Sequence, residues 1–250
     1  MFGKVSSSLM SALFVVLCFT ACETPEPELI APDYPYEYFP TDSGRYCIYQ
    51  VDSIVYNETF ANDTSSWQVK EMVTDTFYDA EGRLNYTIER SRRLSAVDAW
   101  EIMDVWHAAY VNGNVEKVEN NLRFIKLAHP VMNGIQWDGN AYLGGLDDIP
   151  FDYECNRLSY YEGWDYQYQA VEESFSVNEL QFPNTVTVIQ QGDSNLIWYD
   201  YAKEVFAADV GLIYKEFYHY YTQDFTCPTC PWNERVECGY SVRMEIIEYQ

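Results

Sequence analysis

Residues 79–89 read DAEGRLNYTIE, a turn that contains glycine followed by a run in which apolar and polar side chains alternate. The apolar residues of the run occupy positions 84, 86 and 88, and the polar ones occupy positions 85, 87 and 89. A period of two places the apolar set on one face of a β-strand. The stretch therefore predicts a hairpin that leads into a half-buried strand.

Similar runs follow one another outward from this stretch, and none longer than about ten residues has a clean helical period. Asn112-Gly-Asn114 is a turn that tolerates positive φ and predicts a second hairpin. Many strands joined by short turns predict an all-β fold: a single antiparallel, strongly curled sheet or barrel-like domain with little helix. The other expected strands are 46–56, 67–78, 99–111, 115–118, 122–127, 164–177, 185–190, 196–206, 212–225 and 236–249.

The N-terminal segment has the features of an export signal. Lys4 is followed by an apolar run from Leu9 to Ala21, which is shorter than the roughly twenty residues that a membrane-spanning helix needs. A positive start, an apolar run and a small residue at the end are the parts of a signal peptide. We therefore expect residues 1–21 to be a leader that is removed.

The residues around the expected cleavage point suggest a lipid anchor. Phe19-Thr20-Ala21-Cys22 resembles the lipobox of bacterial lipoproteins, although Phe19 replaces the usual aliphatic residue. This resemblance implies that Cys22 carries a diacylglycerol and is the first residue of the mature protein, which would attach to the membrane through lipid. The alternative is a plain secretory peptide in which Cys22 is an ordinary thiol.

Composition separates a tether from a folded domain and excludes some partners. Residues 22–40 are acidic and rich in proline, and we expect them to form a semi-extended tether before one β-rich domain at 41–250. The formal net charge of −24 repels phosphate backbones, so we expect no nucleic-acid partner. The 23 tyrosines suit half-buried sheet surfaces, which again favours strands.

Three cysteines lie close together near the C-terminus. In an exported protein, Cys227, Cys230 and Cys238 are candidates for a disulfide that staples a hairpin tip. A zinc site with His219 or a redox CxxC site are the alternatives. The second half of a zinc ribbon is missing, and Pro228, Pro231 and the flanking strands offer neither a helix N-terminus nor a positive neighbour to stabilise a thiolate, so we expect no metal and no cofactor.

One aromatic segment is a candidate ligand-binding surface. Tyr160, Tyr161, Trp164, Tyr166 and Tyr168 stand beside acids and amides, as they would on a platform whose rings stack on sugars. Alternating aromatics are more often the buried side of a strand. Both interpretations remain open at this stage.

The sequence contains none of the common catalytic motifs: there is no GxSxG, HExxH, P-loop or GxGxxG. Carboxylates that act together in a hydrolase cannot be chosen from 39 acids, because that chemistry depends on their separation in space. We therefore predict that the protein is not an enzyme and assign no catalytic residue. A glycan-binding module and a carboxylate-dependent hydrolase remain as the alternative functions.

Longer stretches resemble a family of uncharacterised cell-envelope lipoproteins from Bacteroidota. They are FPTDSGRYCIYQVDSIVY at 39–56, NNLRFIKLAHPV at 120–131, GIQWDGNAY at 134–142 and FAADVGLIYKEF at 206–217. The resemblance implies a β-rich lipoprotein of the cell envelope. We expect the outer membrane as its location, and as partners the membrane through the lipid anchor together with a glycan or another envelope protein. An acidic residue after the lipidated cysteine, here Glu23, is similar to signals for transport to the cell surface.

Overall fold

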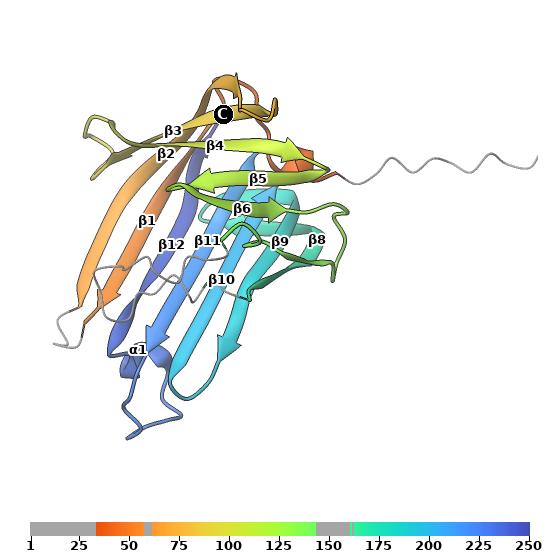
Figure 1. Ribbon diagram of the computed structural model, residues 1–250. Helices are drawn as coiled ribbons and strands as arrows, with labels where there is room; N and C mark the ends of the chain where they lie inside the picture. Colours follow the sequence, from red (N-terminus) through yellow and green to blue (C-terminus); the bar gives the residue numbers. More distant parts are fainter. Residues whose placement is uncertain (1–33, 58–61, 144–160, 162) are drawn as a thin grey trace, which may run out of the picture. The chain divides into compact units, whose positions relative to one another are not determined.

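The strands form one antiparallel sheet in the computed structural model, which describes residues 34–57, 62–143, 161 and 163–250 (Figure 1). Within these residues the sheet has twelve strands, in the order β6-β5-β4-β3-β2-β1-β12-β11-β10-β9-β8-β7. The strands are β1 (Tyr46–Tyr56), β2 (Asp63–Tyr78), β3 (Leu84–Arg93), β4 (Glu101–Val111), β5 (Asn114–Glu119), β6 (Leu122–Leu127), β7 (Gln136–Asp138), β8 (Asp165–Val177), β9 (Leu180–Ser194), β10 (Trp198–Ala207), β11 (Gly211–Tyr221) and β12 (Cys238–Tyr249).

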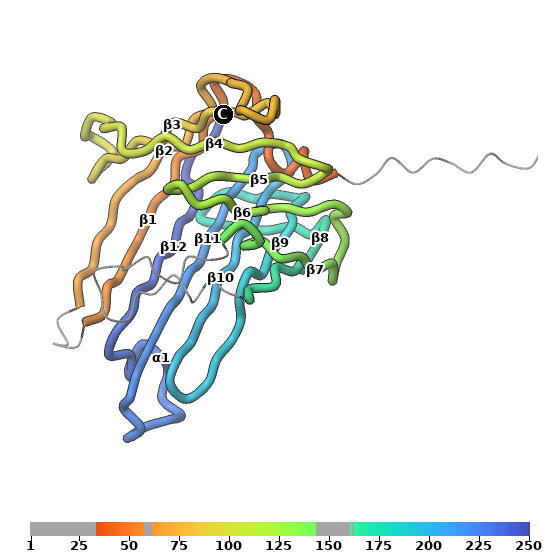
Figure 2. Tube along the Cα trace, viewed as in Figure 1, coloured from red at the N-terminus to blue at the C-terminus, as the bar shows by residue number. Residues whose placement is uncertain are grey.

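The first and last strands lie at the centre of the sheet. Strands β1 to β6 form one meander and strands β7 to β12 form another, and the two join where β1 pairs with β12 from Cys47↔Tyr249 to Tyr56↔Gly239. In Figure 2 the orange start of the described chain runs beside its dark blue end. The two edges of the sheet are therefore β6 and β7.

The two edges approach each other because the sheet curls. The backbone N–H of Ile125 in β6 donates to the carbonyl of Gly139, just after β7, at 2.8 Å. The indole of Trp137 in β7 donates to the carbonyl of Ile125, also at 2.8 Å. These bonds nearly close the sheet into a barrel, which confirms the predicted all-β, strongly curled architecture.

The turns form where the sequence predicts them. In the 79–82 turn the carboxylate of Asp79 accepts the backbone N–H groups of Glu81 and Arg83, and Gly82 has φ +76°. Asn112 and Gly113 also have positive φ, at 51° and 88°, as a tight hairpin turn requires. Both predicted hairpins are confirmed.

The predicted apolar face of β3 is only partly correct. Ile88 is buried as expected, but Leu84 is 37% exposed, whereas Asn85 on the opposite face is 1% exposed. Asn85 is paired with the buried Ala109 of β4, at a place where both faces of the sheet are covered. Alternation identified the strand but did not determine which face is buried at this end.

The described helices are short, and one of them changes the expected start of the domain. They are the 3-10 helix η1 (Pro35–Tyr38) and α1 (Trp232–Arg235). Tyr38 and Phe39 are buried in the main core cluster, and the hydroxyl of Tyr38 donates to Asn184 at 2.9 Å. From residue 35 onward, the segment predicted as tether is therefore part of the fold, because its aromatic side chains pack in the core.

Candidate functional site

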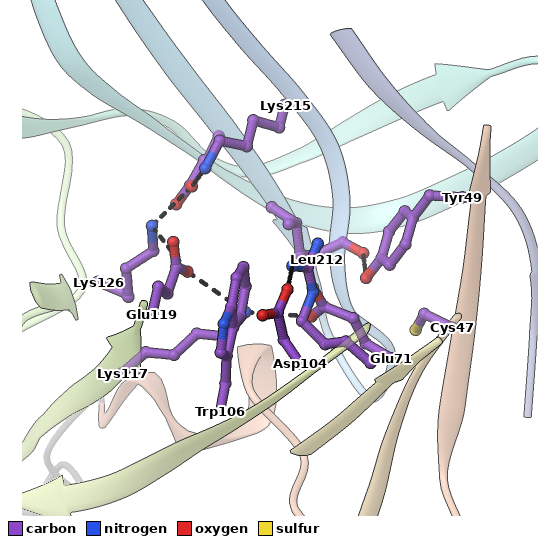
Figure 3. Close-up of polar contacts among 12 residues, drawn as sticks. Cys47, Tyr49, Glu71, Asp104, Trp106, Lys117, Glu119, Lys126, Leu212 and Lys215 are labelled. Atoms are coloured by element: carbon purple, nitrogen blue, oxygen red, sulfur yellow. Dashed lines mark hydrogen bonds and ion pairs between the residues drawn. The ribbon is translucent and has the colours of Figure 1, made fainter. Parts of the chain in front are cut away.

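The interior contains eight charged side chains joined in one series of ion pairs, which we call the charge network (Figure 3). Four are cations and four are anions, so the network carries no net charge in a chain whose formal charge is −24. They come from seven strands, β2 to β6, β10 and β11. The members are Glu71, Arg90, Asp104, Lys117, Glu119, Lys126, Glu204 and Lys215.

One half of the network lies around the ring of Trp106. Arg90 binds Glu71 at 2.9 Å and Asp104 at 3.3 Å, and Lys117 binds the second oxygen of Glu71 at 3.1 Å. Arg90 lies 3.6 Å and Lys117 4.7 Å from the ring centre of Trp106. The ring thus supplies a favourable surface for two cations that are removed from water.

The other half connects two parts of the sheet that are far apart in strand order. Lys117 and Lys126 share Oε1 of Glu119 at 3.4 and 3.6 Å. Lys126 of β6 then binds Glu204 of β10 at 2.7 Å, and Glu204 also binds Lys215 of β11 at 3.0 Å. Because β6 and β10 are not neighbours in the sheet, the Lys126–Glu204 pair bridges the interior and fixes how the sheet folds back on itself.

Several network residues have pKa values shifted in the direction that favours the charged form, namely Glu71, Glu119, Lys126, Glu204 and Lys215. Burial would raise the pKa of Glu204, but the charges of Lys126 and Lys215 outweigh it and the pKa lies below its ordinary value. Burial would lower the pKa of Lys126, but Glu119 and Glu204 outweigh it and the pKa is raised. The carboxyl pKa values of Glu71 and Glu119 are lowered in the same way.

A cavity of about 60 Å³ lies beside the network. Its lining includes Glu71, Lys117 and Lys126 of the network, together with Arg45 and Cys47 of the first strand region. The Cys47 thiol donates to the carbonyl of Val210 at 3.6 Å, and burial raises its pKa to about 12. The thiol is therefore protonated at neutral pH and does not act as a nucleophile there.

None of the carboxyl pKa shifts among the described residues has the direction that the acid of a glycoside hydrolase needs. That chemistry needs one carboxyl with a raised pKa, which stays protonated near neutral pH. The carboxyls whose pKa departs from its ordinary value are all shifted downward: Glu71, Asp79, Glu119, Glu204, Glu216 and Asp224. Over the described residues, nothing favours the carboxylate-dependent hydrolase.

The candidate cysteines lie in the β11–β12 connection and at the start of β12. Cys227 and Cys230 are paired, with their Cα atoms 5.4 Å apart, and Cys238 is also disulfide-bonded. The backbone N–H of Cys230 donates to the carbonyl of Cys227, which closes a tight turn. No cluster of metal-ligating side chains is present among the residues that the structure describes. Cys22 lies outside them.

The predicted aromatic platform is not exposed in the structure. Trp164, Tyr166 and Tyr168 are 2%, 1% and 0% exposed, and all three belong to the main core cluster. Tyr161 packs against the same cluster, while Tyr160 lies outside the described residues. Rings buried in the core cannot stack on a sugar, so these residues do not form the predicted binding surface.

A different aromatic surface lies on the outer face of β10 and β11, and sequence reasoning missed it. Tyr199, Tyr201, Tyr218 and Trp232 are partly exposed, with ring centres 5.8–6.3 Å apart in neighbouring pairs and planes inclined by 11–20°. The register that places Tyr201 opposite Tyr218 brings them together. Alternate tyrosines in 199–201 and 218–220 were the available signal, but only the strand pairing joins them.

Fold and interior together define a curled β-sheet braced by internal ion pairs. No protein-family model matches the chain, and no curated protein matches it. Among solved structures, it is similar to a chain from Parabacteroides distasonis ATCC 8503 that is described as a candidate lipoprotein. The TM-score is 0.31 and the identity 12%, over 85% of this chain and 98% of the other. At that level the likeness carries no argument about function.

Both described helices have four residues, and none of the helices in the described part of the chain is long and apolar enough to cross a bilayer.

Proposed function

We propose that this chain is a lipid-anchored protein of the bacterial cell envelope with a structural or binding role. The observation that carries the proposal is Phe19-Thr20-Ala21-Cys22 at the end of a thirteen-residue apolar run that follows Lys4. A lipid anchor fixes the location without requiring the chain to span the bilayer. Several acyl chains at about 0.8 kcal/mol per buried methylene make such attachment durable.

The interior supports a role without catalysis. The charge network holds its carboxylates and cations in opposite-charge pairs. The carboxyl pKa values of Glu71, Glu119 and Glu204 are lowered and the ammonium pKa values of Lys126 and Lys215 are raised, which moves all five away from neutrality. General acid–base catalysis works best with groups whose pKa lies near the working pH. A network of this kind suits a brace for the fold better than a proton donor or acceptor.

Metabolic labelling with a fatty-acid analogue tests the anchor. The wild-type protein should take up the label, and Cys22→Ala should take up none. Cys18→Ala is the matched control, because it removes a neighbouring cysteine that would leave with the leader, and it should label like the wild type. Equal labelling of wild type and Cys22→Ala would contradict the proposal, as would a native protein that begins upstream of residue 22.

Within the envelope, we propose the outer membrane, with the domain facing outward. Glu23, next to the lipidated cysteine, supports this orientation through its similarity to surface-transport signals. Protease added to intact cells should then cleave the protein, while a periplasmic marker stays whole. Protection until the cells are lysed would place the domain on the inner side.

The aromatic surface formed by Tyr199, Tyr201, Tyr218 and Trp232 supports glycan binding as a second candidate function. Within it, Tyr201 and Tyr218 lie two residues along β10 and β11 from Lys203 and Glu216, whose ion pair measures 3.1 Å, so apolar ring surface and charged groups lie close together. Titration calorimetry against a panel of neutral polysaccharides should give heat with the wild type and less with Tyr201→Ala. Tyr78→Ala, an exposed tyrosine elsewhere, is the control. No heat with any polysaccharide would remove this candidate.

A further inference from the structure

Strand β4 extends beyond its neighbour β5. The β4–β5 pairing covers only the residues from His107↔Val118 to Val111↔Asn114. Residues 101–106 pair with β3 on one side, and no described strand or backbone hydrogen bond satisfies their other side. The first half of β4 is therefore an open edge, with backbone donors and acceptors available to another strand.

A bulge places apolar side chains together on this edge. Asp104 lies opposite Arg90 and Ile102 opposite Ser91, so Met103 is an additional residue in β4. Because of this extra residue, Ile102 and Val105 lie on the same face of the strand. They are 67% and 63% exposed. The edge thus presents two neighbouring aliphatic side chains to solvent.

The open edge has only part of the usual protection against pairing. Natural edge strands are guarded by charged side chains, above all lysine, by proline, by bulges or by inward-pointing charges. The segment 101–106 reads EIMDVW and has the bulge and Glu101, but neither lysine nor proline, and Asp104 is neutralised by Arg90 at 3.3 Å. An edge with so little protection and two exposed aliphatic side chains can still accept another strand.

The charge near this edge permits the approach of a second acidic chain. Arg92 and Arg93 of β3 and Lys70 of β2 lie close by, and Lys70 and Arg93 hold the ring of Trp100 at 5.4 and 4.2 Å. These three cations offset the acidic side chains near the connection between β3 and β4, whereas the chain as a whole carries a formal charge of −24. Repulsion between two copies is therefore smaller here than over an average part of the surface.

We propose that two copies of this chain pair antiparallel through residues 101–106 of β4 and form a symmetric dimer with a continuous sheet across the contact. A two-fold axis between Met103 and Asp104 places Ile102 of each copy opposite Val105 of the other. Glu101 then lies opposite Trp106, so no like charges face each other. The register satisfies the open backbone and buries both aliphatic side chains.

A lipid surface fits this edge less well than a strand does. The aliphatic side chains could enter a bilayer, but they would take unsatisfied backbone N–H and C=O groups with them, and each such group costs several kcal/mol in hydrocarbon. A strand supplies the missing partners. The proposal does not depend on lipid attachment, although an anchored protein would reach a higher local concentration on a membrane.

Sedimentation equilibrium of the full chain, in a density-matched detergent and over about a hundredfold range of concentration, tests the dimer. The wild type should associate, and Val105→Lys should weaken dimerisation at least about tenfold, because it places a charge opposite an aliphatic side chain. Leu196→Lys, at a similarly exposed position on another hairpin, should associate like the wild type. Circular dichroism should show that both variants stay folded.

Hydrogen exchange then tests the register. The amides of residues 101–106 that point away from β3 should become protected as concentration rises in the wild type and stay unprotected in Val105→Lys. A wild type that remains monomeric over the whole range overturns the proposal, as does a dimer in which these amides exchange freely. Loss of binding to lipid vesicles in Val105→Lys, with a monomeric wild type, would instead assign the edge to the membrane.

Discussion

Replacing Glu204 by leucine should be among the most damaging single substitutions in the core. The Glu204 side chain is 1% exposed and that of its partner Lys126 is 5% exposed, with 2.7 Å between the charged atoms. In Glu204→Leu, Lys126 keeps only the longer contact to Glu119 and Lys215 loses its carboxylate. Removal of one member of a buried ion pair costs about 3–5 kcal/mol.

The expected loss is large enough to measure in two ways. A domain of this size loses about 2–4 °C in Tm for each kcal/mol, so Glu204→Leu should lower the Tm by roughly 6–20 °C. Urea unfolding followed by tryptophan fluorescence should give the free energy directly. Glu81→Gln is the control, since the 2.8 Å pair of Glu81 with Arg83 is exposed and should contribute less than about 1 kcal/mol.

The double variant Lys126→Met/Glu204→Leu separates a lost pair from a lost side chain. It replaces both charges of the Lys126–Glu204 pair by apolar groups of similar size, so the buried Lys126 ammonium no longer faces leucine, and only the partly exposed Lys215 still does. It should be more stable than Glu204→Leu alone by at least about 1 kcal/mol. The reasoning is refuted if the free energy of unfolding of Glu204→Leu lies within about 1 kcal/mol of that of the wild type. It is also refuted if the loss in the double variant equals the sum of the losses in Glu204→Leu and Lys126→Met measured separately.

Four further predictions follow from other parts of the fold. Gly239→Ala should cost more than about 4 kcal/mol, because its Cβ would lie 2.0 Å from the carbonyl oxygen of His219, whereas Gly192→Ala, with open space around it, should cost less than about 1 kcal/mol in urea unfolding. Because Glu71, Glu119 and Glu204 have lowered pKa values in the folded state, their contribution to stability should be complete above about pH 5 and fall as the pH drops toward those values; urea midpoints unchanged down to pH 3 would contradict this. Iodoacetamide at pH 8 should label Cys47 slowly in the folded protein and rapidly in urea. Mass spectrometry of the unreduced protein should find Cys227 linked to Cys230, and alkylatable thiols there would exclude the staple.

The strands were largely predictable because their signals are local. Alternation and turn residues located β1 and β6 with the bounds that the structure has, and predicted both hairpins. Strand β7, with three residues, was missed because so short a segment has no period to detect. The order of the strands was not predictable, since the pairing of β1 with β12 joins residues about two hundred positions apart.

The interior site was not predictable for a related reason. Lys126 and Glu204 are 78 positions apart, and nothing near either residue marks it as a buried partner of the other. The aromatic segment 160–168 shows the opposite difficulty: its composition suited both a core and a platform, and only tertiary packing could choose between them. Burial of Trp164, Tyr166 and Tyr168 decided for the core.

The central ladder between β1 and β12 has a consequence for how the chain reaches its native state. On export as proposed above, the N-terminal part of the chain would emerge first, so β1 would stay unpaired on one side until β12 (Cys238–Tyr249) had also crossed the membrane. Contacts over such sequence distances make folding slow, and strands that remain unpaired are prone to aggregate. The proposed export would therefore make folding depend strongly on chaperones, and removal of β12 should split the sheet through its middle instead of shortening one edge.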